Sequence, residues 1–401
     1  MKKVLLFIGL LLFSISVFAC KKEVTSPLVI SKVFDATVQA NNAIELYNTS
    51  NELIDLKDYA LDFYSNGSKE VSTTIMLEGQ IKANDYFAVA SKNANDEDLL
   101  QLRDFSYEEG SLPYNGNDAI ALVYKDVIID YIGIPESDVE FAKDLTLIRL
   151  GNKEDYKGSK TFDLFSFIYY LPDRFNYLKN DTHAIKTLEQ LYEGPKLEDR
   201  YKSMPYVDPN NSTFGGGGAL KTTVQRISDG DTAHFNAVGD FVGGSVRYFY
   251  LNTPEVDGTM RAEAWGYVAS KYNKEYLLND PSSKEIYIQS MKGYSLTEGY
   301  GRSLALVWIN GHLSQFLIVS EGLSEDVGMK YEAHDLAMHY KDVPYLTFLR
   351  FAENRAKQNG WATKGYPIKA DGEKSPDWNY QTSTNTTTSP QWQPHLPIPW
   401  A

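Results

Sequence analysis

The chain of 401 residues contains a single cysteine, Cys20, and this scarcity excludes any disulfide within the chain. Stability must therefore come from hydrophobic cores, and 43% hydrophobic residues in a chain of this length suffice for two or three of them. Long apolar runs are scarce as well. Beyond the N-terminus, no run of the sequence is long and apolar enough to cross a bilayer.

Positive charge is in deficit, because 39 Lys and Arg residues stand against 53 Asp and Glu residues, which gives a formal net charge of −14. Phosphate contacts dominate non-specific affinity for nucleic acid, so this balance argues against a protein that coats nucleic acid or adheres to anionic lipid by charge. An enzyme that engages a polyanion transiently, at a local positive cleft, stays compatible with it.

Two common site motifs are also missing. The glycine run 215–218 is not followed by the Gly-Lys-Ser/Thr of a phosphate-binding loop, so we interpret it as a flexible hinge. His334 and His339 are five residues apart, whereas two imidazoles on one helical face need a spacing of four. Neither feature therefore predicts a site.

The N-terminus has the pattern of an export signal. Lys2 and Lys3 form a positive segment, and the apolar stretch 4–17 follows it. We expect residues 1–19 to be a signal peptide that is removed, so that this stretch does not span the membrane in the mature protein.

Cys20 directly follows Ala19, and this site resembles the lipobox of bacterial lipoproteins. The resemblance implies lipidation of Cys20 and a lipidated N-terminus over residues 20–27. The alternative is a plain signal peptide that is cut after Ala19 and leaves a free thiol. We therefore expect a protein anchored by lipid at the extracellular face of the cell membrane, or a secreted one if Cys20 is not lipidated.

Short strand-like segments alternate with Asn, Gly, Asp and Ser turns over residues 28–166, which predicts an all-β sandwich. The stretches AIELYNTSNELIDLKDYALDFYSNG and LPYNGNDAIALVYKDVIIDYIG resemble the lamin-tail domain, an immunoglobulin-like sandwich. The resemblance implies that this domain could bind a partner at the cell surface. Glu45 lies on an alternating strand where polar residues face solvent, and Asn48 suits the turn that ends it, so we expect structural roles for both.

Two further segments look irregular. Residues 167–219 are predicted to be a linker, with helical spacing only over 182–192. Residues 367–401 are rich in Pro, Thr, Ser and Asn, and this composition predicts a disordered tail, unusual in containing Trp378, Trp392 and Trp400.

Carboxylates and arginines gather between these two segments. The turn Asp229–Thr232 reads DGDT, and Asn252–Glu255 reads NTPE at the end of a later strand-like run that contains Arg247. Arg302 follows in the segment GYGR. Hard cations prefer such oxygen ligands, and guanidinium groups stabilise the charge of a pentacovalent phosphorus. The residue types therefore favour phosphodiester chemistry.

The ordered set of DGDT, VR, NTPE and GYGR, followed by EGL at residues 321–323, resembles the staphylococcal-nuclease family over about residues 220–366. The resemblance implies an α+β domain, an OB-fold barrel with helices. It also implies a calcium-dependent nuclease that hydrolyses DNA and RNA with little base specificity.

The same resemblance implies a role for each matching residue. Calcium would be bound by Asp231, by Asn252 and by the backbone carbonyl of Thr253. Arg247 would bind the phosphate, and Glu255 would orient or deprotonate the attacking water. Arg302 would stabilise the transition state and the leaving oxygen, and Tyr300 would contact the nucleotide.

Asn252 departs from the family pattern, which usually has a second aspartate here. An amide keeps one ligand oxygen but loses a negative charge, so we expect weaker calcium binding. Two alternatives stay open: an enzyme that prefers another divalent ion, and a catalytically weakened surface lipoprotein that binds nucleic acid or a surface partner.

Overall fold

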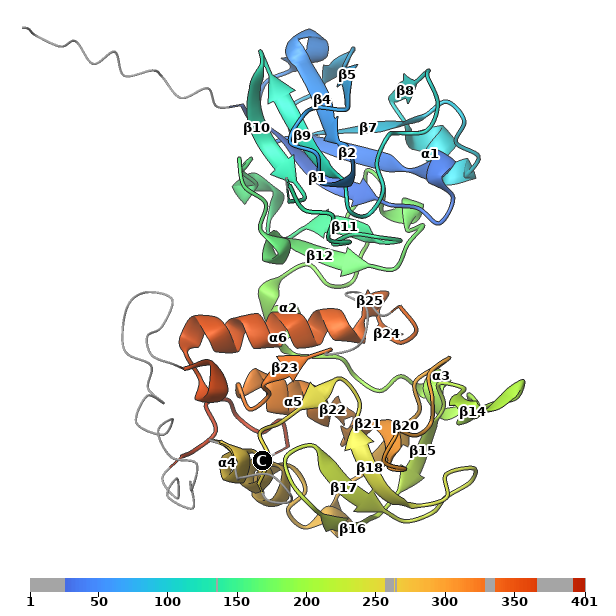
Figure 1. The fold of residues 1–401 in the computed structure, drawn as a ribbon. Helices are drawn as coiled ribbons and strands as arrows, with labels where there is room; N and C mark the ends of the chain where they lie inside the picture. The colour runs from blue at the N-terminus through green and yellow to red at the C-terminus, as the bar shows by residue number, and fades with distance from the viewer. Residues whose placement is uncertain are drawn as a thin grey trace, which may run out of the picture.

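The computed structural model describes residues 26–134, 136–256, 263, 265–328, 336–365 and 392–400. The predicted signal peptide, Cys20 and the first part of the predicted tail lie outside these residues. The described chain is mostly β, with several sheets and few helices. None of its helices is long and apolar enough to cross a membrane. Figure 1 shows two stacked bodies, with α6 (Tyr345–Asn359) of the second facing the first.

The N-terminal body is a sandwich of two sheets. One has the order β12 (Phe167–Tyr170), β11 (Thr146–Arg149), β1 (Leu28–Phe34), β2 (Ala43–Asn48), β7 (Tyr86–Ser91) and β8 (Phe105–Tyr107); the other has the order β10 (Val127–Ile132), β9 (Ala119–Tyr124), β4 (Tyr59–Tyr64) and β5 (Thr73–Met76). A small pair joins β3 (Ile54–Asp55) to β6 (Gln80–Ile81). Alternate residues of both sheets, including Leu46, Leu61 and Leu122, share one hydrophobic core, as the predicted sandwich requires.

The outer face of the six-stranded sheet is also covered, and this overturns the expectation that Glu45 faces solvent. Phe175 and Leu178 pack with α1 (Glu97–Leu102) on that face. Glu45 is fully buried there, where its carboxylate lies 2.8 Å from the ammonium of Lys32 on the neighbouring strand. The backbone amide of Lys179 donates to the same carboxylate at 2.6 Å. The segment that contains Phe175 and Leu178 thus covers this face of the sheet, and Glu45 is buried beneath it instead of facing solvent.

Asn48 has the structural role that the sequence predicts for it. Its amide donates to the carbonyls of Glu52 at 2.7 Å and Lys82 at 2.9 Å. Its side-chain oxygen accepts from the backbone amide of Ser50 at 2.9 Å. The buried amide thereby fixes the turn after β2.

Much of the predicted linker 167–219 is ordered, and its first residues belong to the sandwich. β12 has the sequence FIYY, all buried, and pairs with β11 at the edge of the six-stranded sheet. The rest contains α2 (Leu188–Tyr192), α3 (Asp199–Lys202), β13 (Val207–Asp208) and β14 (Asn211–Gly215). Burial of aromatic side chains therefore orders this segment, which the sequence had predicted to be a linker.

The glycine run 215–218 is buried, so its interpretation as a flexible hinge is wrong. Gly217 donates to the hydroxyl of Ser290 at 3.1 Å. A Cβ atom on Gly218 would lie 2.2 Å from the carbonyl oxygen of Met204. The run lacks side chains because two backbone segments approach each other closely here.

The C-terminal body is built on a mixed sheet. Its strands run in the order β15 (Ala219–Thr222), β20 (Ile286–Gln289), β21 (Ser303–Ile309), β18 (Gly244–Tyr248), β17 (Thr232–Phe235) and β16 (Val224–Ile227), with β22 (His312–Leu313) on β21. β18 and β21 are parallel, and the other pairs are antiparallel. The pairing of the described strands follows an open path, so the closed OB-type barrel stays a prediction.

Helices and short strand pairs complete this body. Helix α4 (Gly266–Lys271) continues into a π-helical segment, Tyr272–Leu277, and helix α5 (Ser314–Ser320) packs against α6. Strand β19 (Leu251–Asn252) pairs with β23 (Asp326–Val327), and β24 (His339–Tyr340) pairs with β25 (Val343–Pro344). Helix α6 ends at Gly360, which adopts the left-handed conformation common after helices.

The described end of the predicted disordered tail, residues 392–400, packs against this body. Trp392 is 2% exposed and meets Tyr272 edge to face, with ring centroids 6.0 Å apart. The backbone amides of His395 and Leu396 donate to the buried carboxylate of Glu321 at 2.7 and 2.9 Å. Composition alone did not predict this docking, because two tryptophans, Trp392 and Trp400, supply the apolar area that packs on the core.

Candidate active site

Three adjacent strands bring the predicted site together. On β17 and β18, Thr232 lies opposite Arg247, and on β18 and β21, Arg247 lies opposite Leu304. Arg302 precedes β21 by one residue. The DGDT turn, Arg247 and Arg302 therefore lie at the same end of three adjacent strands, although 70 residues separate Thr232 from Arg302 in the sequence.

The DGDT turn is held by its own side chains and by a close neighbour. The backbone amide of Asp231 donates to the Asp229 carboxylate at 3.1 Å, as in an Asx-type turn. A Cβ atom on Gly230 would lie 2.6 Å from the hydroxyl of Thr253 and 2.8 Å from the Cβ of Ala269. Glycine at this position thus lets the turn approach the NTPE segment and α4.

Asp231 is the buried centre of the site, with 1% of its surface exposed. One carboxylate oxygen, Oδ2, accepts from the backbone amide of Thr253 at 2.7 Å and from its hydroxyl at 3.0 Å. The other, Oδ1, accepts from the guanidinium of Arg247 and from the hydroxyl of Thr232, the latter at 3.1 Å. Burial raises the pKa of Asp231, and the charge of Arg247 opposes that rise.

Arg247 also donates to the side-chain oxygen of Asn252, so one guanidinium spans two of the predicted calcium ligands. The amide nitrogen of Asn252 donates in turn to Oε2 of Glu325 at 2.9 Å. Burial, followed by the charges of Glu263 and Glu255, raises the pKa of Glu325. A carboxylate from a distant segment therefore stands beside the position where the family pattern has an aspartate.

Glu255 lies within electrostatic reach of both arginines. Burial is the largest cause that raises the pKa of its carboxyl and the charge of Asp229 adds to it, whereas Arg247 and Arg302 lower it. The backbone amide of Glu255 donates to Oε2 of Glu263 at 2.8 Å, which fixes the end of the NTPE segment. A carboxyl with a raised pKa near two cations is suited to accept a proton.

Arg302 is held from two sides. Its Nε donates to the carboxylate of Glu298, and its Nη1 lies 3.5 Å from the hydroxyl of Thr232. About a third of its side chain is exposed, at 31%. Tyr300, in the same turn, is 90% exposed and so presents its ring to solvent rather than to the core. This arrangement leaves Arg302 and Tyr300 reachable by a ligand.

A hard cation needs several oxygen ligands around one point. The described residues contain no group of three His, Cys, Asp or Glu side chains placed to hold a metal ion. Asp231 and Asn252 nonetheless direct oxygen atoms at one guanidinium, so the site collects acceptors around a positive charge. One carboxylate, one amide oxygen and the backbone carbonyl of Thr253 match the oxygen ligands of calcium, with water completing the shell.

Three glutamates of the site were not predicted from the sequence. Glu263 accepts from the backbone amide of Glu255, and Glu298 accepts from the guanidinium of Arg302. Glu325 accepts from the side-chain amide of Asn252. Glu298 had a usable signal, because it stands four residues before Arg302 in the same turn. Glu263 and Glu325 stand in no spacing pattern that distinguishes them from solvated carboxylates.

The chain is similar to known proteins of two kinds. Residues 21–136 match the family model described as Lamin Tail Domain. Two curated Bacillus subtilis (strain 168) proteins are similar to the chain: "Endonuclease YncB", 30% identical over 153 residues (37% of this chain, 64% of that protein), and "SPbeta prophage-derived endonuclease YokF", 30% identical over 151 residues (37% and 46%). The chain thus spans about half to two thirds of these relatives. It carries a lamin tail domain, and its similarity to endonucleases is consistent with a nuclease domain that follows it.

Proposed function

We propose that this protein is an exported, membrane-anchored nuclease that depends on calcium and hydrolyses the phosphodiester bonds of DNA and RNA with little base specificity. One observation carries the proposal: Arg247 joins Asp231 to Asn252, while Glu255 lies within the electrostatic reach of Arg247 and Arg302. Similarity to two named endonucleases supports a nuclease at the coarser level.

The chain's own residues can perform each part of a hydrolysis. Glu255 takes a proton from water as the water oxygen bonds to phosphorus, and the bond from phosphorus to the 5′ oxygen breaks on the opposite side. Arg247 and Arg302 donate to the phosphoryl oxygens, whose negative charge grows in the transition state. The products are a 3′-phosphate and a 5′-hydroxyl, whose oxygen takes its proton from solvent, while Glu255 returns the proton that it accepted to solvent. The raised pKa of Glu255 suits the first transfer.

Calcium would be held by Asp231, Asn252 and the carbonyl of Thr253, and when bound it supplies positive charge that neutralises the phosphate. Arg247 contacts the first two residues. In the proposal its guanidinium turns from these oxygens to the phosphate, so Arg247 keeps the oxygens in place between turnovers.

The lipidated Cys20 would place the enzyme at the extracellular face of the cell membrane, and the lamin tail domain would hold it away from the lipid or bind a surface partner. A nuclease in this position degrades environmental nucleic acid. The net charge of −14 fits transient engagement of the substrate rather than stable coating.

The test is cleavage of single-stranded DNA and RNA by the chain from Lys21 onward, with calcium, magnesium, manganese or a chelator. Glu255→Ala and Arg302→Ala should each lose activity by about 100-fold or more. Lys274→Ala, an exposed position in the same body, should retain it. No cleavage with any of these ions by a folded protein would overturn the proposal and leave a surface lipoprotein that binds nucleic acid or a surface partner.

A further inference from the structure

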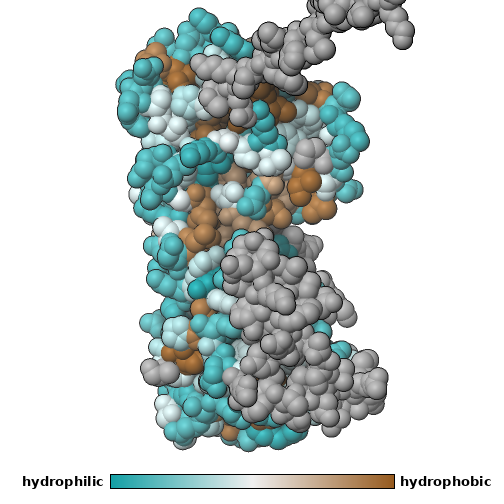
Figure 2. Space-filling model, turned by 90° about the vertical axis from the view of Figure 1, so that its left-hand side faces the viewer, coloured by the Kyte–Doolittle hydropathy of each residue, from teal (hydrophilic) through white to brown (hydrophobic). Residues whose placement is uncertain are grey.

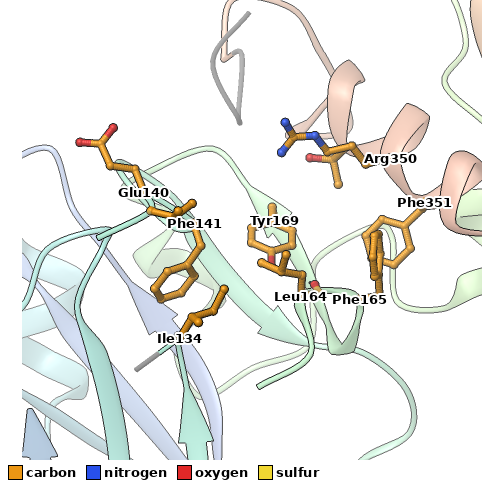
Figure 3. Close-up of a pocket in the computed structure, with 10 residues that line it drawn as sticks. Ile134, Glu140, Phe141, Leu164, Phe165, Tyr169, Arg350 and Phe351 are labelled. Atoms are coloured by element: carbon orange, nitrogen blue, oxygen red, sulfur yellow. The ribbon is translucent and has the colours of Figure 1, made fainter. Parts of the chain in front are cut away.

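A cavity lies where the N-terminal body meets α6. It has a volume of about 230 Å³, and both bodies contribute to its wall, as Figure 3 shows for Phe141, Leu164, Phe165 and Tyr169 from the first body and for Arg350 and Phe351 from α6. Phe165 and Phe351 meet edge to face across the junction, with ring centroids 5.2 Å apart. The cavity therefore exists only because the two bodies are joined.

Large apolar side chains reach solvent at the rim of this cavity. Ile134, Val139 and Leu164 line it, and they are 38%, 57% and 37% exposed. Figure 2 shows hydrophobic surface at the level where the two bodies meet. Exposed apolar side chains around an apolar cavity are typical of ligand sites, because a bound apolar group would remove them from water.

Two polar groups on α6 line the same cavity without a partner among the described residues. The hydroxyl of Thr347 is fully buried and makes no hydrogen bond. The guanidinium of Arg350 makes no ion pair or hydrogen bond with any described residue; burial lowers its pKa, and the charges of Glu353 and Asp326, which are not paired with it directly, oppose that change. An arginine stays charged in such a setting. Thr347 is buried and Arg350 is half-buried, and the lack of a directly bonded partner costs free energy at both, so a bound acceptor would lower that cost.

The carboxylate that lines the cavity does not neutralise Arg350. Glu140 pairs with the ammonium of Lys143 at 2.9 Å, and its carboxylate points away from the cavity in Figure 3. The cavity thus combines apolar walls, one cation and the unbonded hydroxyl of Thr347, since the hydroxyl of Tyr169 already donates to the carbonyl of Leu164 at 2.9 Å.

We propose that this junction cavity binds a small organic carboxylate with an apolar body. Its carboxylate lies on Arg350 and Thr347, and its body lies against Phe141, Phe165 and Phe351. A guanidinium matches the two oxygens of a carboxylate, and a hydroxyl adds a third hydrogen bond. A cavity of about 150 Å³ already holds a benzene molecule, so this one accommodates one ring or a medium-length alkyl chain. The site is separate from the candidate active site and does not depend on nuclease activity.

The experiment is calorimetric titration of the chain from Lys21 onward, which contains every described residue. The probes are 4-phenylbutyrate and octanoate, which separate an aromatic acid from a lipid-derived one, and 4-phenylbutanamide as the uncharged control. We expect at least one acid to bind and the amide to bind at least tenfold more weakly. Arg350→Met should weaken acid binding by about tenfold or more and Thr347→Val by about threefold, whereas Arg355→Met, on the same helix but outside the cavity, should not.

Three results would overturn the proposal: no binding of either acid at millimolar concentration, equal binding of the amide, or undiminished binding by Arg350→Met. If Arg350→Met fails to fold, Leu164→Trp decides instead, because an indole at the rim fills the cavity and leaves Arg350 in place. Loss of acid binding by folded Leu164→Trp supports the site, and unchanged binding refutes it.

Discussion

Arg247 donates through its guanidinium to the buried carboxylate of Asp231, which belongs to the turn just before the adjacent strand. Asn252 accepts from a second nitrogen of the same guanidinium. A planar fork can reach two acceptors at once, whereas an ammonium is a single point of charge on a flexible stem. The geometry at Arg247 therefore depends on arginine itself and not only on its charge.

Arg247→Lys should lower kcat/KM on single-stranded DNA by about 100-fold, because one transition-state donor is lost and the alignment of Asp231 with Asn252 is relaxed. The measurement is steady-state cleavage at saturating calcium. Arg226→Lys, an exposed position on β16, serves as the matched control and should leave kcat/KM unchanged. Comparable activity of Arg247→Lys and the unmodified chain would show that charge alone suffices.

Asn252 is explained by its neighbour Glu325. The amide nitrogen of Asn252 donates to Oε2 of Glu325 at 2.9 Å, so an aspartate in its place would bring two carboxylates together. Asn252→Asp should lower the thermal midpoint in chelator by about 2–4 °C, the shift expected for about 1 kcal/mol in a body of this size, because Arg247, which contacts this side chain, is already paired with Asp231 and offsets only part of the repulsion from Glu325. Adding Glu325→Gln should restore the midpoint.

The double variant also tests the calcium proposal. With Glu325→Gln present, Asn252→Asp should bind calcium more tightly than the natural pair does, because a full negative charge is then available to the cation. Calorimetric titration with calcium measures this directly. Unchanged stability of the single variant, or weaker calcium binding by the double variant, would contradict this account of Asn252.

The sequence identified residues that the structure brings together, but not the side chains that surround them. Asp231 and Arg247 belong to local motifs whose order along the chain carries information, and the structure brings them into contact. Glu263 and Glu325 could not be predicted, because single glutamates become part of a site only through folding of distant segments.

The fold shows the same limit. Alternation of apolar residues predicted the sandwich, yet it placed Glu45 in solvent, because a strand pattern does not reveal what covers the outer face of a sheet. The glycine run 215–218 looked flexible for a similar reason. Close approach to the backbone of Met204 leaves no signature in composition.

The buried pair of Lys32 and Glu45 gives a test of that covered face. Glu45→Gln leaves a buried ammonium without its counter-charge and should cost about 3–5 kcal/mol of unfolding free energy. Lys32→Met/Glu45→Gln removes the charge and keeps an acceptor for the amide of Lys179, so most of the loss should be recovered. Urea denaturation measures both variants. A single variant as stable as the unmodified chain would mean that the pair is hydrated in solution.

Asp35 should make the stability of the N-terminal body depend on pH. Burial raises the pKa of its carboxyl to about 7, and the charges of Asp144 and Asp118 add to the rise. Because the folded-state pKa lies above the unfolded value, this contribution to stability is fully present below about pH 4 and is lost as the pH rises through about 7.

Asp35→Asn isolates this effect, since an amide cannot ionise but can still accept from the backbone amide of Asp144, as the carboxylate does at 2.8 Å. The variant and the unmodified chain should be nearly equal in stability at about pH 4, and the variant should become the more stable as the pH rises to about 7 and stay so at pH 8. Urea midpoints across this range measure the difference. A difference that does not change with pH would exclude Asp35 as its source.

The docked C-terminal segment should stabilise the nuclease body and its site. Trp392 packs on the π-helical segment 272–277, in which Asn273 donates to the carbonyl of Asp229 at 2.9 Å. Trp392→Ala should cost about 3–5 kcal/mol of unfolding free energy and lower cleavage activity as well.

Truncation after residue 391 should act similarly, because Glu321 then loses the amide donors of residues 395 and 396. Glu321→Gln should therefore cost more in the full chain than in a folded truncated chain, and equal costs would show that the segment does not bear on Glu321.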